Sequence, residues 1–148
     1  AMDLGPADRT LDLRYIRAMI AHHRGAMLLA EQLTKTTARP EMASLAESIL
    51  KDEPAAIDEL NAWKKEWYGD NRAVADPAVA NLGPADEKSD LRFLNALIAH
   101  HKAGIAMTQE IRLKSSRAEI LDNADAVEDF LSGGVEMLRT LRKEWYNL

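Results

Sequence analysis

The sequence predicts an all-α protein, a four-helix bundle built from two tandem helical hairpins that are related by a pseudo-twofold axis. Three observations support this prediction. Leu, Ala, Glu, Lys and Arg, which favour helices, are abundant in a 148-residue chain that is 47% hydrophobic and 29% charged. Apolar residues recur three and four positions apart over long stretches, as on the buried face of a helix. The third observation is an internal repeat.

The repeat relates residues 4–68 to residues 82–146 by one constant offset of 78 positions. The segments "LGPAD", "DLR", "IAHH" and "KEWY" occur in both copies at that offset, so the copies align without a gap. Residues 69–81, rich in Ala, Asp and Pro, are the expected linker. We therefore expect one bundle domain over residues 1–148, to which each copy contributes a hairpin.

Each copy contains two amphipathic helices. The first is expected from about Asp8 to Thr36, with Asp8 as its N-cap and Asp86 as the N-cap in the second copy. The second helix is expected to start near Pro40, because proline is favoured in a first helical turn. Its inward face carries one carboxylate, Glu53, at the position where the second copy has Leu131.

Composition excludes several classes of function. The net charge of −5 and the absence of a basic stripe argue against a nucleic-acid partner. The chain has no cysteine, hence no disulfide and no thiolate metal site, and no apolar run reaches the ~18 residues of a membrane span. The start "AMDLGPAD" contains no signal peptide, and because Ala1 precedes Met2 we expect the natural N-terminus to differ.

The four histidines form two adjacent pairs at equivalent positions of the two copies, His22 with His23 and His100 with His101. On a helical wheel His23 lies in the middle of the apolar stripe and His22 at its edge. Thioethers share these faces, since two methionines flank His23 at four residues and a third follows His100 by seven. A buried polar group without a partner costs roughly 1–3 kcal/mol, so these imidazoles need a metal, a hydrogen bond, Glu53 or trapped water.

Imidazole and thioether ligands without cysteine favour Cu(I) or Ag(I), whereas the histidines alone also suit Cu(II) or Zn(II). No Glu-x-x-His pair of a di-iron centre, no His-Glu-x-x-His zinc motif and no marked nucleophile is present, so the pattern indicates binding and not an enzyme. Glu53 is expected to act as a hydrogen-bond partner or as a ligand. The candidate metal residues are His22, His23, His100, His101, Met19, Met27, Met107 and Glu53.

These residues resemble a bacterial family, the ferritin-like "domain of unknown function 305". Its segment Met-Ile-x-His-His-x-x-Ala-x-x-Met-Ala is matched by Met19, Ile20, His22, His23, Ala26 and Ala30, and its later positions by Ile49, Ile57 and Trp63 or Trp67. The second copy matches with Ile98, His100, His101, Met107 and Trp145. The chain departs from the pattern at several positions, among them Glu53, where the family has Gln.

The resemblance implies a ferritin-like four-helix fold and a periplasmic or secreted location. Some relatives bind copper through His and Met. The leading hypothesis is therefore an extracytoplasmic copper-binding bundle for storage, buffering or delivery, with a metal-trafficking protein as its partner. The alternative is a structural or protein-interaction domain with a buried His and Glu hydrogen-bond network. A third hypothesis is a small-molecule sensor or enzyme that uses His23 and Glu53 as an acid–base pair.

Overall fold

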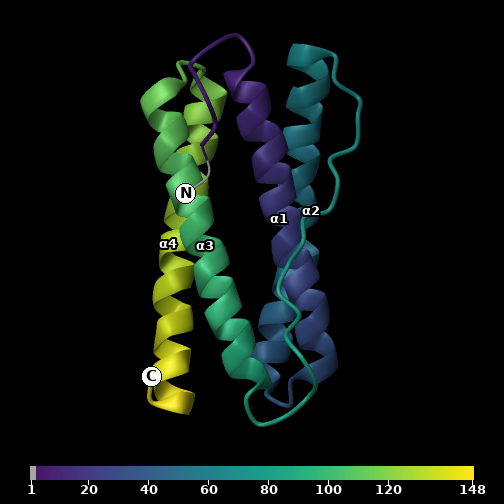
Figure 1. The fold of residues 1–148 in the computed structure, drawn as a ribbon, viewed down its shortest axis with the longest axis vertical. Helices are drawn as coiled ribbons and strands as arrows, with labels where there is room; N and C mark the ends of the chain where they lie inside the picture. Colours follow the sequence, from purple (N-terminus) through teal and green to yellow (C-terminus); the bar gives the residue numbers. More distant parts are fainter. Residues whose placement is uncertain (1–2) are drawn as a thin grey trace.

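The computed structural model describes residues 3–148 and consists of four α-helices connected by loops. The helices are α1 (Leu11–Thr36), α2 (Pro40–Tyr68), α3 (Ser89–Lys114) and α4 (Ala118–Tyr146). Helices α1 and α2 form one antiparallel hairpin, α3 and α4 form another, and α1 runs antiparallel to α3 where the hairpins meet (Figure 1). The prediction of an all-α four-helix bundle is confirmed. The expectation about Ala1 and Met2 lies outside the described residues.

The helix bounds follow the sequence repeat, since α3 and α4 begin and end 78 positions after α1 and α2. The predicted start of α2 at Pro40 is confirmed. The predicted N-caps are wrong, because α1 is preceded by Thr10 and α3 by Lys88, and neither makes a side-chain capping bond. Asp8 instead accepts a hydrogen bond from the Thr10 amide, which places it in the turn before the helix.

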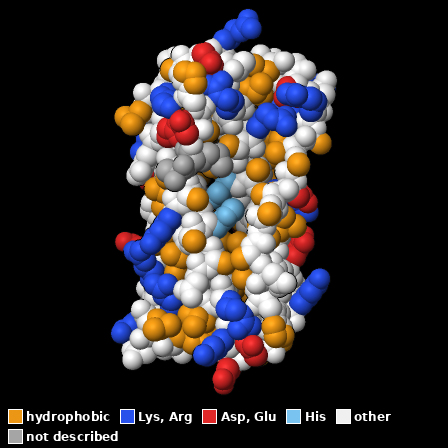
Figure 2. Space-filling view, viewed as in Figure 1, with side chains coloured by type: hydrophobic (Ala, Val, Ile, Leu, Met, Phe, Trp, Pro, Cys, Tyr) orange, Lys and Arg blue, Asp and Glu red, His pale blue; other side chains and the backbone are white. Residues whose placement is uncertain are grey.

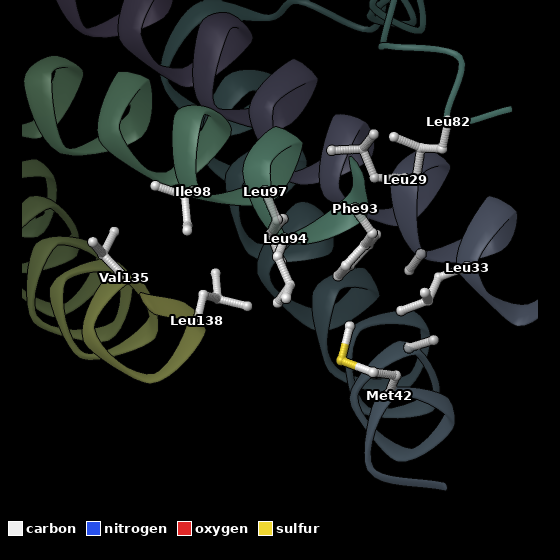
Figure 3. Packing of buried hydrophobic residues seen from close by; sticks show 12 residues of the cluster. Leu29, Leu33, Met42, Leu82, Phe93, Leu94, Leu97, Ile98, Val135 and Leu138 are labelled. Atoms are coloured by element: carbon white, nitrogen blue, oxygen red, sulfur yellow. The ribbon is translucent and has the colours of Figure 1, made fainter. Parts of the chain in front are cut away.

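The core consists of two clusters of buried apolar side chains, one towards each end of the bundle. The first contains Leu33 and Met42 from the first hairpin, with Phe93, Leu94 and Leu138 from the second (Figure 3). The other cluster contains Tyr15, Met19, Leu60, Met107 and Ile120. Both clusters draw on all four helices, so burial of apolar surface holds the two hairpins together.

The segment between α2 and α3 runs back along the outside of the bundle to reach the start of α3 (Figure 1). It is attached to α1 by Arg24, whose Nε lies 2.9 Å from Asp76, and by Gln32, which bonds Ala80 and Leu82. These contacts place part of the segment over the face where α1 and α3 meet. In residues 3–148, no helix combines the length and the apolar character that crossing a membrane requires.

Candidate metal centre

The four histidines lie near the middle of α1 and α3, where these helices pack against each other. His22, His23 and His101 are buried, and His100 is half-buried. Histidine side chains reach the surface in the centre of the face shown in Figure 2. His22 and His100 line a hollow of about 190 Å³ there, which we call the α1–α3 hollow. The antiparallel packing of α1 and α3 thus brings the two His pairs to one level of the bundle.

His22 and His100 bind each other's backbone across the α1–α3 contact. The Nε2 of His22 donates to the carbonyl oxygen of His100 at 2.8 Å, and the Nε2 of His100 donates to that of His22 at 2.7 Å. The two rings are stacked, with centroids 4.0 Å apart and planes 5° apart. Because Nε2 carries the proton in each neutral ring, Nδ1 carries the free lone pair.

Two glycines provide the space for this stacked pair. A Cβ atom on Gly104 would lie 2.6 Å from the ring of His22, and one on Gly25 would lie 2.8 Å from the ring of His100. Any other residue at either position would push an imidazole out of its place. Glycine is unfavourable inside a helix, so these two residues were a sequence signal that the helices approach closely around the histidines.

His23 points away from the stacked pair towards α2, where it meets Glu53. Its Nδ1 lies 2.5 Å from Oε2 of Glu53, and both side chains are largely buried. The two atoms are within ion-pair distance but not aligned as a hydrogen bond, and Oε2 of Glu53 has no other partner. The other ring nitrogen of His23, Nε2, is buried without a partner. A carboxylate behind one nitrogen and a free opposite nitrogen is the arrangement that many metal-binding histidines adopt.

His101 lies at the equivalent position in the second copy but meets different groups. It packs against α4, where a Cβ atom on Gly134 would lie 2.8 Å from its Nε2 and Cδ2. Its Nδ1 is buried and has no hydrogen-bond partner. Leu131, the counterpart of Glu53, is apolar and buried, so the second hairpin offers this imidazole no carboxylate of its own.

Unpartnered polar atoms gather around one cavity of about 290 Å³, which we call the inner hollow. Its lining includes His22, His23, Glu53 and His101, together with apolar residues of α4. The Nδ1 atoms of His22 and His101, the Nε2 of His23 and the Oε2 of Glu53 are all buried without hydrogen bonds. Each unpartnered buried atom costs stability, so the three ring nitrogens without any partner, on residues that line one cavity, are a reason to expect a bound group there.

The three candidate methionines occupy different places. Met107 is buried and lines the α1–α3 hollow beside His22 and His100. Met19 is fully buried in the same apolar cluster as Met107. Met27 is only half-buried, and its sulfur lies 4.0 Å from Nη1 of Arg24. Met27 thus lies four residues after His23 on the same helix but at the edge of the buried face, where Arg24 is its polar neighbour.

Burial keeps three of the imidazoles neutral at pH 7. Desolvation, and then the neighbouring His100, lowers the pKa of His22 to about 3. Desolvation likewise lowers the pKa of His101 to about 4, although the charge of Glu53 acts in the opposite direction. The pKa of His100 is also lowered by burial. A neutral imidazole has the free lone pair that a metal requires, so these rings need not lose a proton before binding.

The chemistry of these atoms fits a soft or borderline metal ion, although the ligands are not yet gathered around one point. Within residues 3–148, no cluster of three or more His, Asp and Glu is already arranged to hold an ion. Free imidazole nitrogens and a nearby thioether are the donors that Cu(I) and Ag(I) prefer. The sequence predicted the histidines, Glu53 and Met107 as site residues. It did not predict the role of Gly25 and Gly104, or the hydrogen bonds from His22 and His100 to each other's backbone carbonyl, which depend on how α1 packs against α3.

Fold and site together define a helical bundle with two largely buried histidine pairs at the contact between its hairpins. The chain belongs to the family described as "Domain of unknown function (DUF305)", whose pattern matches residues 12–87, just over half of the chain. The matched residues include the first histidine pair, α2 and the linker, and the predicted resemblance to this family is confirmed. No curated protein matches the sequence.

Several solved structures have a similar fold. CopM in the Cu(I)-bound form has a TM-score of 0.80 and 25% identity, over 91% of this chain and 97% of that chain. CopM in the Ag-bound form has a TM-score of 0.80 and 24% identity with the same coverage. A DUF305 fragment from Deinococcus radiodurans has a TM-score of 0.77 and 20% identity, over 93% of this chain and 97% of the fragment.

Proposed function

We propose that the protein is an extracytoplasmic metal-binding bundle that takes up Cu(I), or Ag(I) in its place, for storage, buffering or delivery. The single observation that carries this proposal is the set of buried ring nitrogens without partners on His22, His23 and His101, three residues that line the inner hollow, with Glu53 beside His23. The fold similarity to CopM, whose structures include Cu(I)-bound and Ag-bound forms, supports the same metal.

The proposed ligands differ in how ready they are to bind. His23 and His101 line the inner hollow, and each has one buried ring nitrogen without a hydrogen-bond partner. His22 and His100 bind through Nδ1, which leaves their carbonyl bonds in place, with Met107 beside them in the α1–α3 hollow. Met19 is a core residue in the same apolar cluster as Met107. Met27 is not among the proposed ligands, because its sulfur lies 4.0 Å from the cationic guanidinium of Arg24. Since no complete cluster exists beforehand, the ion itself must draw the side chains together.

A metal ion that must draw its ligands together is bound less tightly than one in a preformed site, because part of the binding energy is used to order the ligands. Moderate affinity suits a protein that passes copper to a metal-trafficking partner. The export that this role requires is part of the proposal and comes from the family resemblance. A binding role, and not catalysis, is the one that the donor set supports best.

The test is a calorimetric titration of the metal-free protein with Ag(I). We expect the affinity to fall by more than about tenfold in His23→Ala/His101→Ala, in His22→Ala/His100→Ala and in Met107→Leu, and to stay unchanged in the matched variant Met27→Leu. Protons compete for the same nitrogens, so binding weakens as the pH falls. Because burial lowers the pKa of His22 and His101, this weakening is expected nearer pH 4 than pH 6.5.

A second candidate function is a structural or interaction domain without metal, which the reciprocal hydrogen bonds of His22 and His100 favour. In that case the histidine pairs serve only to hold α1 against α3. Stoichiometric Ag(I) or Cu(I) would then leave the melting temperature unchanged, and equal Ag(I) uptake by the native chain and both histidine variants would exclude the copper proposal.

A further inference from the structure

An open groove of about 460 Å³ runs between α2 and α4 and lies mostly outside the candidate metal centre. We call it the α2–α4 groove. Its floor is formed by the buried residues Ala26, Leu97 and His101, and its walls are exposed or half-buried side chains of α2 and α4. At one end it shares Glu53 and His101 with the inner hollow, and from there it extends along the helices to Leu45 and Met137. Its volume is that of a typical small-molecule site, about 300–1,000 Å³.

The walls of the α2–α4 groove are apolar and partly uncovered. Leu45 and Ile49 line the α2 side, and Phe130 and Met137 line the α4 side. Phe130 is 68% exposed and Met137 is 44% exposed. Two of the four large hydrophobic side chains that are exposed in residues 3–148 therefore lie at this one groove. A gathering of exposed apolar side chains around a concave site indicates a ligand with an apolar body.

The charge at the groove has one sign. Three carboxylates line it, Asp52 and Glu53 on α2 and Asp129 on α4, whereas no Lys or Arg is among its described lining residues. The carboxylates stand on both walls, so an occupant between α2 and α4 lies in a negative potential from two directions. An anionic ligand is disfavoured by this arrangement, and a cation is attracted.

Gly133 keeps the groove open. It lines the groove in the middle of α4, and a Cβ atom at this position would have no other atom within 4 Å. Packing therefore does not require glycine here, in contrast to the neighbouring Gly134. Glycine destabilises a helix interior relative to alanine, so its presence at an uncrowded position needs another reason. A larger side chain at this position would occupy the space between the two walls.

We propose that the α2–α4 groove binds a small organic cation with an apolar or aromatic body. The apolar walls bury the body, the ring of Phe130 offers a face for cation–π contact, and the carboxylates on both walls select for positive charge. This ligand class is distinct from the metal ion of the proposed function. The proposal depends on the groove residues alone and holds whether or not the chain binds copper.

The test uses the metal-free full chain and two probes of equal shape and opposite charge, tetraphenylphosphonium and tetraphenylborate, measured by isothermal titration calorimetry. Tetraphenylphosphonium is expected to bind at one site per chain, and tetraphenylborate is expected not to bind. Gly133→Leu adds a large side chain at a lining position where the Cβ atom meets no other atom within 4 Å, and it should abolish binding of the cation. The matched variant Ser132→Leu adds the same side chain at the adjacent exposed position, which does not line the groove, and should bind like the native chain.

The contribution of charge is measured with two matched pairs of substitutions. Asp52→Asn/Asp129→Asn should weaken binding of tetraphenylphosphonium by roughly threefold to tenfold, since exposed charges contribute modestly. Asp58→Asn/Asp122→Asn removes the same charge from exposed positions of α2 and α4 outside the groove and should change it little. Equal binding of both probes, equal loss in both pairs, or full binding by a folded Gly133→Leu chain would overturn the proposal.

Discussion

His23 and His101 occupy equivalent positions in the two halves of the molecule, yet the second helix of each hairpin gives them different neighbours. In the first half, Glu53 approaches His23 to 2.5 Å. In the second half, the equivalent position is the apolar Leu131, and His101 packs against the backbone of Gly134. The same imidazole is thus backed by a carboxylate in one half and by apolar atoms in the other.

This difference shows that a repeated motif does not ensure a repeated chemical environment. A carboxylate behind an imidazole raises the basicity of its free nitrogen and fixes its orientation, whereas an apolar wall does neither. We therefore expect His23 to be the stronger of the two ligands. His22 and His100 have the same hydrogen-bond partner in both halves, because each donates to a backbone carbonyl, which every residue type supplies.

The largest expected effect is on stability at low pH. The folded-state pKa of His22, about 3, and of His101, about 4, lie below their usual 6.5, so the unfolded chain takes up these protons first as the pH falls. Stability is therefore fully present above pH 6.5 and is lost towards pH 4 and below, by on the order of 5 kcal/mol for His22. Urea unfolding of the metal-free protein at pH 7 and pH 4 measures the loss.

The contribution of each half to that loss is separated by substitution. His101→Gln removes the titrating group of the second half, and His22→Gln that of the first. Each variant should lose less stability than the native chain between pH 7 and pH 4, with the smaller dependence in His22→Gln. An unchanged pH dependence in both variants would show that other groups determine acid unfolding.

The next effect concerns the carboxylate itself. Glu53→Leu gives the first half the residue of the second half, and under the proposed function it should weaken Ag(I) binding by about tenfold to a hundredfold, since His23 loses its partner. Glu53→Gln keeps the shape and tests the charge alone. Calorimetric titration is the measurement, and an unchanged affinity in Glu53→Leu would show that the two halves bind metal alike.

A smaller effect on stability is expected where one half has glycine and the other has alanine at the equivalent position. Gly134→Ala gives α4 the residue that α2 has at Ala56, but its Cβ atom would lie 2.8 Å from His101. Displacing the buried ring costs about 1–3 kcal/mol, partly offset by a helix-propensity gain of up to about 1 kcal/mol. We expect a net loss of about 1 kcal/mol in urea unfolding. A gain in stability would mean that His101 moves aside freely.

The smallest effect has the opposite sign and serves as the control for the previous one. Gly133→Ala gives α4 the residue that α2 has at Ala55, at a position where the new Cβ atom meets nothing within 4 Å. The variant should be more stable by about 0.5–1 kcal/mol, because alanine favours the helix. Thermal unfolding should show a rise of a few degrees, and a fall would contradict the open space assigned to this position.

Much of this architecture follows from local pattern. The spacing of apolar residues indicated four helices, Pro40 indicated the start of α2, and the offset of 78 recurs in the helix bounds. The N-terminal ends were predicted less well, since Asp8 was expected to cap α1 and instead bonds the amide of Thr10. A turn and a cap use the same short acidic side chains, so sequence alone does not distinguish them.

The sequence predicted which residues form the site but not which contacts they make with one another. The helical wheel placed His23 and Glu53 on inward faces, and both are largely buried and in contact. It placed His22 only at the edge of the stripe, although packing of α3 against α1 buries this ring and stacks it on His100. The spacing also puts Met27 near His23, and the structure adds that Met27 is only half-buried, with its sulfur 4.0 Å from Arg24.

The order of residues by itself determined which segments are helical and which side chains face inward, because backbone geometry fixes the period along each helix. Only the tertiary structure decided the neighbours of each imidazole: a backbone carbonyl for His22 and His100, a carboxylate for His23, and the backbone of Gly134 for His101. Those contacts depend on how closely each helix approaches its neighbour. That distance is set by residues remote in the chain, such as Gly104, whose lack of a Cβ atom leaves room for the ring of His22.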